Sequence, residues 1–150
     1  MPATGGLLWR DVPGYVLVQV GGAFAGVASA HLMFGEPLFA FSHHARSGMS
    51  QLWSEFVATF GLLAVIRGGA RERPAALPFA VGAYIAAAYW FTASTSFANP
   101  AVTLARATTD TFAGIRPADA PGFIGAQLLG AGAAAMLFRW LMPGCAPGQA

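Results

Sequence analysis

Charge is scarce in this chain. Only 9% of its 150 residues are charged, whereas a soluble domain usually carries about a quarter, and 56% are hydrophobic. All eight basic residues are Arg and none is Lys. No basic run of the kind that binds nucleic acid occurs. The composition therefore places the chain in the membrane class.

Cysteine is almost absent as well. The single Cys145 excludes a disulfide framework and a cysteine-based metal site. The sequence contains no Gly-rich phosphate loop after a strand, no nucleophile near a His and an acid, and no metal-ligand spacing. His43 and His44 are adjacent in a loop with no other ligand nearby, so we expect them to be solvated. We expect no enzymatic activity and no metal or other cofactor.

Long apolar runs predict four membrane spans, because about 20 helical residues cross a bilayer core. These spans lie at about residues 13–35, 48–66, 75–94 and 121–142. Residues 67–74 read as a tight charged turn with three Arg, whereas residues 35–50 contain one. The positive-inside rule then predicts that loop 67–74 is cytoplasmic. The sequence thus predicts an all-α, multi-pass protein of the plasma or inner membrane, with residues 1–150 as a single domain.

One apolar run is too long for a single span. It extends without a charge from Ala75 to Ala105, which is 31 residues. Asn99 and Pro100 interrupt it with a helix-start signature, since Asn caps a first turn and Pro fits the first helical position. We therefore expect a half helix over about residues 99–107, at a depth where irregular backbone persists only if buried in protein or lining a wet cavity. The positive dipole end would face that cavity and discourage cations.

An internal repeat relates the two ends of the chain. At an offset of 108 residues, positions 11–25 match positions 119–133 with seven identities in fifteen. The first and fourth spans would run antiparallel, so the repeat is inverted, as in many transport folds. Gln19 and Gln127 are repeat mates, for which we expect hydrogen bonds between helices. The same offset puts the mate of Asn99 ahead of the first residue, so we expect two spans and one half helix of the first repeat to be missing.

Asn99-Pro100-Ala101 resembles the second NPA box of the aquaporin and glycerol-facilitator family. The order of spans, the acid inside the second span and the repeat extend this resemblance over residues 5–142. The resemblance implies an aquaporin-like helical bundle in a lipid bilayer, a homotetramer in the full-length form, and a pore for water or a small neutral solute. It also implies that Asn99 presents its side-chain amide to the passing solute, while Pro100 and Ala101 fix the turn.

The resemblance also supplies candidates for a selectivity filter. Most of the family has Arg directly after the box, where this chain has Val102, and the filter position of the preceding span falls at or near Ala87. Both residues imply a wide, uncharged constriction that suits a polyol or a metalloid hydroxide. Arg106 lies one turn further on and is not assumed to replace the family's Arg; we group it with Glu55 as support for the half helix. Glu55 is expected to accept hydrogen bonds from nearby backbone, with a proton relay as the alternative.

Two functional hypotheses follow. The first is a passive channel for water or small neutral solutes, without coupling to ions. The second is a truncated remnant that conducts nothing alone and serves as a structural partner of other subunits. A secondary transporter would need an ion-coupling site for which only Glu55 is available, so we set it aside.

Overall fold

The computed structural model describes residues 8–141, and this part of the chain is all-helical, with no strand. Cys145 lies outside the described residues. The elements, in chain order, are η1 (Trp9–Asp11), α1 (Val12–Phe34), α2 (Met49–Glu72), η2 (Pro74–Ala76), α3 (Leu77–Phe91), α4 (Pro100–Arg106) and α5 (Ala120–Leu141). Four segments are long and apolar enough to cross a membrane: Trp9–Phe34, Met49–Glu72, Pro74–Phe91 and Ala120–Leu141. The predicted all-α bundle with four apolar helices is confirmed.

Proline and glycine set the helix ends. Pro13 and Pro100 each occupy the first turn of a helix, where a missing backbone N–H costs no hydrogen bond. Gly35 ends α1 in the left-handed conformation, with φ of 70°, and donates its N–H to the His31 carbonyl. These signals are local, which explains why the sequence already locates the starts of α1 and α4.

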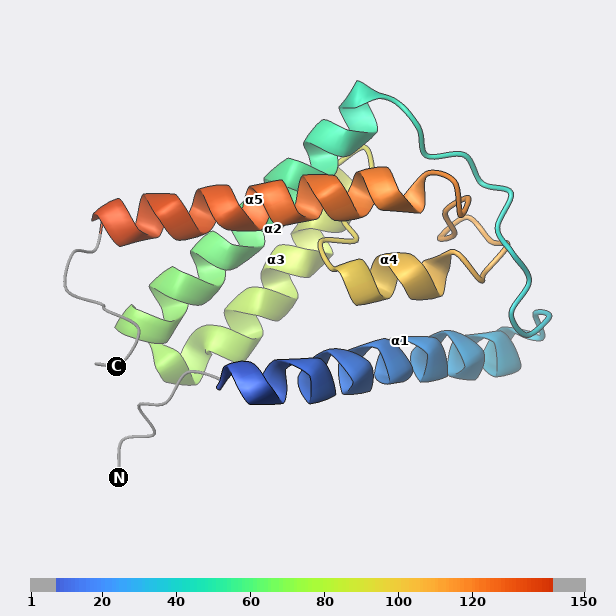
Figure 1. Ribbon diagram of the computed structural model, residues 1–150, viewed down its shortest axis with the longest axis horizontal. Coiled ribbons are helices and arrows are strands. Elements are labelled where there is room, and N and C mark those ends of the chain that lie inside the picture. The colour runs from blue at the N-terminus through green and yellow to red at the C-terminus, as the bar shows by residue number, and fades with distance from the viewer. Residues whose placement is uncertain (1–7, 142–150) are drawn as a thin grey trace.

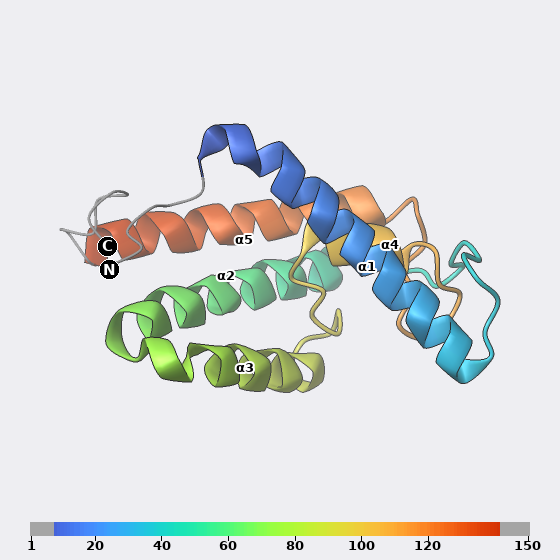
Figure 2. The same ribbon diagram turned by 90° about the horizontal axis from the view of Figure 1, so that it is seen from below.

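The four long helices alternate in direction (Figure 1). The start of α1, the end of α2, the start of α3 and the end of α5 lie toward the same end of the molecule. The short helix α4 runs in the same direction as α3 after an irregular segment, and in Figure 2 it lies beside α1 rather than in line with α3. Helices α1 and α5 run antiparallel, and their first residues, Val12 and Ala120, are 108 positions apart (120 − 12), the offset of the sequence repeat.

The most extensive helix contact joins α2 to α5. At its closest point, a Cβ added to Gly130 would lie 2.5 Å from the Phe56 carbonyl oxygen, so the two backbones nearly touch. Helix α4 packs against α5 on one side and α1 on the other, and Figure 2 shows α1 crossing α4. Among the described elements, α1 contacts only the short helix α4 and η1. The small residues Gly22 and Gly26 of α1 accordingly have open space beside them.

Large apolar side chains lie on the outside of the bundle. Trp90 on α3 is 92% exposed and Phe79 is 80% exposed, and α1 and α5 carry similar apolar outer faces. One cluster of buried apolar residues lies next to α4: it consists of Phe97, Ala107, Ile115 and Phe123, with Leu52 and Val102 packed against it. An apolar exterior of this extent needs lipid rather than water around it. The chain is a multi-pass membrane protein.

The predicted turn at residues 67–74 is wrong in extent. Helix α2 continues through Glu72, and Arg73 alone separates it from η2. Arg and Glu have good helix propensity, and basic residues favour the last turn of a helix, so the charged segment extends α2 beyond the apolar run. The third span is correspondingly shorter than residues 75–94, since α3 covers Leu77–Phe91.

Candidate functional site: the half helix and its cavity

The half helix α4 starts at a side-chain cap. Asn99 has an extended backbone, and its Oδ1 accepts a hydrogen bond of 2.8 Å from the Ala101 N–H. The Thr103 N–H and Oγ1 both donate to the Asn99 carbonyl at 3.0 Å. The cap uses Oδ1 and not the Nδ2 amino group, so the amide can still donate to another molecule.

The carboxylate of Glu55 anchors the turn that leads into α4. It is fully buried on α2 and accepts four hydrogen bonds, from Ser94 Oγ (2.6 Å), Phe97 N (2.8 Å), Ala98 N (2.9 Å) and Gln127 Nε2 (2.6 Å). A carboxylate offers about four lone-pair sites, so this one is saturated. The resemblance implied backbone donors for Glu55, and the structure places two there. A saturated carboxylate suits an anchor better than a proton relay, which needs a free acceptor site.

The turn held by Glu55 is strained. Thr95, Ser96 and Ala98 all have positive φ, at 59°, 49° and 50°, although none is Gly. Such conformations cost about 1–3 kcal/mol each and persist where the surroundings over-determine them. The Ser94 Oγ and the Glu55 carboxylate supply that constraint by accepting from the backbone of Ser96, Phe97 and Ala98. The turn that leads into α4 is therefore held in its conformation by side-chain acceptors, one on the same segment and one on α2.

Arg46 is a structural residue that the sequence reasoning missed. The residue is 95% buried, and its guanidinium donates to the carbonyls of Gly114 (2.7 Å), Ser94 (2.9 Å) and Phe112 (2.7 Å). Its backbone N–H donates to Asp119 at 2.9 Å. A single side chain thus joins the loop after α1 to the segments before and after α4. Nothing in its sequence neighbourhood distinguishes it from a solvated loop Arg.

Two aspartates, Asp110 and Asp119, accept hydrogen bonds that hold the same loops. The backbone N–H of His43 donates to Asp110 at 2.8 Å, and this bond with the His43 ring at 3.1 Å holds the pKa of Asp110 below its usual range. The Arg116 guanidinium at 2.9 Å lowers the pKa of Asp119. These contacts stabilise the loops at neutral pH and are lost as the pH falls through the lowered pKa values. No group of three or more His, Cys, Asp or Glu within residues 8–141 could hold a metal ion.

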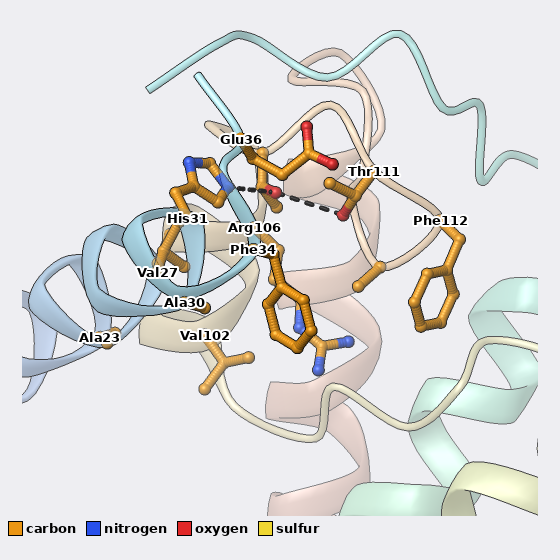
Figure 3. Close-up of a pocket in the computed structure, with 14 residues that line it drawn as sticks. Ala23, Val27, Ala30, His31, Phe34, Glu36, Val102, Arg106, Thr111 and Phe112 are labelled. Carbon is orange, nitrogen blue, oxygen red and sulfur yellow. Dashed lines mark hydrogen bonds between the residues drawn. The ribbon is translucent and has the colours of Figure 1, made fainter. Parts of the chain in front are cut away.

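A cavity of about 570 Å³ opens between α1 and α4 (Figure 3). Helix α1 contributes a mainly apolar wall that includes Val27 and Ala30, and α4 contributes Val102, Ala105 and Arg106. His31 closes one end: it is 96% buried, and its Nε2 lies 2.6 Å from Thr109 Oγ1. The cavity is thus apolar along one wall and polar at one end, where His31, Glu36 and Thr109 line it.

The structure brings together some of the predicted site residues and not others. Val102 and Arg106 line the cavity, whereas Ala87 is exposed on α3 and is not part of its wall. Gln127 makes the expected bonds between helices, to Glu55 and to Thr103 Oγ1. The same expectation for Gln19 is wrong, because its Nε2 donates within α1 to Tyr15 at 3.2 Å. His31, which the sequence analysis did not single out, is buried at the cavity end.

A bundle of apolar helices with a capped half helix set beside a cavity defines a class of membrane protein that includes channels and transporters. No family model matches the chain, and no solved structure matches it. The chain is 56% identical over 144 residues to Aquaglyceroporin AqpS of Rhizobium meliloti (strain 1021). That alignment covers 96% of this chain and 62% of the relative, so the chain spans less than two thirds of the relative's length. Over nearly its whole length, the chain is therefore similar to part of an aquaglyceroporin.

Proposed function

We propose that this chain forms part of a passive channel for water or small neutral solutes. The observation that carries the proposal is α4, a half helix capped by Asn99 that begins inside the bundle and ends beside the cavity. The similarity to an aquaglyceroporin supports the same function. Solutes would then be selected by their size, by the dipole of α4 and by the residues that line the pore, without coupling to ion transport.

The lining favours solutes larger than water. Val102 supplies a short apolar side chain where most of the family has Arg, and the α1 wall opposite carries Ala23, Gly26 and Ala30. Small side chains on facing helices leave width, and the polar end at His31 and Thr109 offers partners for hydroxyl groups. We infer that glycerol-like polyols or metalloid hydroxides pass through the channel. Ala87 would contribute to solute selection only if it faced a further subunit or segment.

The proposal extends to the setting of the channel. Helix α2 carries three Arg near its end, close to the starts of α1 and α3 and the end of α5, which supports a cytoplasmic location for residues 67–74. We expect the plasma or inner membrane, a homotetramer in the full-length form, and residues 1–150 as one domain.

A non-conducting partner subunit is the second candidate. It is favoured by one observation, that α1 contacts the short helix α4 but none of the long helices in the described part of the chain. A helix with one neighbour leaves the cavity open on its other flank. In that case the chain would conduct only together with other subunits.

Solute uptake into proteoliposomes separates these readings. We expect glycerol to enter vesicles that contain the chain faster than protein-free vesicles, as measured by stopped-flow light scattering. Val102→Arg restores the family's residue, and we expect it to lower the glycerol-to-water permeability ratio about tenfold, as for a barrier raised by about 1.4 kcal/mol. Fast water flux that excludes glycerol would contradict the wide filter. Flux equal to that of empty vesicles would favour the partner subunit.

A further inference from the structure

Positive charge collects at the end of the bundle where α2 and α5 finish. Four exposed arginines lie at or just after these helix ends, and we call them the basic patch: Arg67, Arg71, Arg73 and Arg139. The ends of α2 and α5 lie near one another in both views (Figures 1 and 2), and these two helices make the most extensive contact in the bundle. Residues 67–74 and 136–141 contain one acid, Glu72, so the patch carries a net charge of +3 (4 − 1).

Most of this charge has no partner within the described chain. Arg67, Arg73 and Arg139 form no ion pair with any group in residues 8–141. Arg71 approaches Glu72 at 3.6 Å, and both side chains are exposed, at 55% and 76%. An exposed pair at this distance contributes little to stability, because water and salt screen it. The basic patch therefore keeps its charge available for a partner outside the chain.

Two exposed tryptophans indicate the level of the lipid headgroups at this end. Trp140 is 76% exposed and directly follows Arg139, and Trp9 is 89% exposed at the start of η1. Helix α1, which follows η1, starts at the same end of the molecule as α5 finishes. Exposed Trp is typical of the membrane interface, because its ring is apolar and its N–H is polar. The basic patch thus lies at the depth of the lipid phosphates.

The chemistry of the patch suits a phosphate group. A guanidinium can donate two parallel hydrogen bonds to phosphate oxygens, whereas the ammonium of Lys acts as a point charge, and every basic residue of this chain is Arg. Arg67 and Arg71 are four residues apart on α2, so they share one face and can reach the same headgroup. Gly68 beside them leaves open space. The carbonyl ends of α2 and α5 carry about half a negative charge each, which the patch outweighs.

We propose that the basic patch is a binding site for the phosphate headgroup of an anionic phospholipid, with Arg67 and Arg71 as its main contacts. The site lies at the opposite end of α2 and α5 from the turn that leads into α4, so it is independent of the proposed channel function. The positive-inside rule explains why charge collects on one side of a membrane. A patch that only set the orientation of the chain would need positive charge but no preference for guanidinium.

Spin-labelled lipids measure this binding without requiring conduction. The chain is reconstituted into phosphatidylcholine vesicles that contain a trace of spin-labelled phosphatidylglycerol or spin-labelled phosphatidylcholine. Electron paramagnetic resonance then gives the fraction of each label that the protein immobilises. We expect phosphatidylglycerol to associate about three- to fivefold more strongly than phosphatidylcholine, as for a basic side chain close to an anionic headgroup.

Three variants locate the site and test its chemistry. Arg67→Gln combined with Arg71→Gln should abolish the preference, and the same two positions changed to Lys should keep about half of it, because the charge remains and the paired hydrogen bonds do not. Arg116→Gln, which removes an exposed Arg ahead of the start of α5, is the matched control and should leave the preference unchanged. Circular dichroism of each variant verifies that the helices are retained.

Three results would overturn the site. The first is equal association of the two lipids with the parent chain. The second is a preference that the Gln variant keeps or that Arg116→Gln removes equally, which would place the attraction elsewhere. The third is a preference that the Lys variant keeps in full, which would show a diffuse attraction to charge without a guanidinium–phosphate contact. None of these results would alter the proposed channel function, which solute uptake tests separately.

Discussion

Replacing Glu55 with Ala is expected to lower the free energy of unfolding by about 3–5 kcal/mol. Four donors point at this buried carboxylate, from Ser94, Phe97, Ala98 and Gln127. Truncation would leave them unsatisfied, and each buried orphan costs about 1–3 kcal/mol unless water enters. The strained turn before Asn99 would also lose its constraint. Thermal or denaturant unfolding in detergent micelles gives the measurement.

Two further variants make the Glu55 prediction specific. Glu55→Gln keeps the shape but aims an amide N–H₂ at donors, so we expect a loss of about half that size. Glu72→Gln removes an exposed acid at the end of the same helix and should change stability by less than about 0.5 kcal/mol. Equal stability of Glu55→Ala and the parent protein would show that the carboxylate does not hold the half helix.

Replacing Gly130 with Val should separate α2 from α5 and cost about 3 kcal/mol. A Cβ at this position would lie 2.5 Å from the Phe56 carbonyl oxygen and 3.2 Å from the Phe60 nitrogen, and backbone atoms cannot move aside as side chains can. Because Gln127 and Glu55 meet across the same helix pair, the shift would also disturb the anchor of α4. The same unfolding measurement applies, with solute uptake as a second readout.

Gly132 on the same helix is the matched control. A Cβ there would meet nothing within 4 Å, so Gly132→Ala should be neutral or stabilising by up to about 1 kcal/mol, through helix propensity. If Gly130→Val and Gly132→Ala behaved alike, the close approach of α2 and α5 would not contribute to stability.

Local signals predicted much of this fold. Pro13, Gly35, Asn99 and Pro100 mark helix ends through their own backbone chemistry, and apolar length identified the spans. The repeat offset of 108 predicted that α1 and α5 correspond, and they start at Val12 and Ala120. The charged segment after residue 66 was misjudged because charge ends an apolar run without ending a helix.

The site depended on contacts that sequence does not contain. Arg46 acquires its role from carbonyls at Ser94, Phe112 and Gly114, which lie more than 45 positions away in the chain. Arg106 reaches the cavity because Tyr89 and Phe97 orient its guanidinium, and only the tertiary arrangement brings them together. Family spacing alone indicated Ala87, which is exposed on α3 and does not line this cavity, so its place in a filter stays a prediction.

The central claim is that α4 begins within the bilayer and faces water there, which spin-label accessibility tests most directly. Gln127 bonds Thr103, so Val102 on α4 and Leu128 on the outer face of α5 lie at similar depth. With nitroxides at these positions in a Cys145→Ser background, we expect a water-soluble nickel chelate to relax the label at 102 more than that at 128, and oxygen to do the reverse. Equal, strong nickel relaxation at both positions would place this level outside the lipid, and relaxation of both labels mainly by oxygen would leave α4 without a watery passage. Either result would contradict the account.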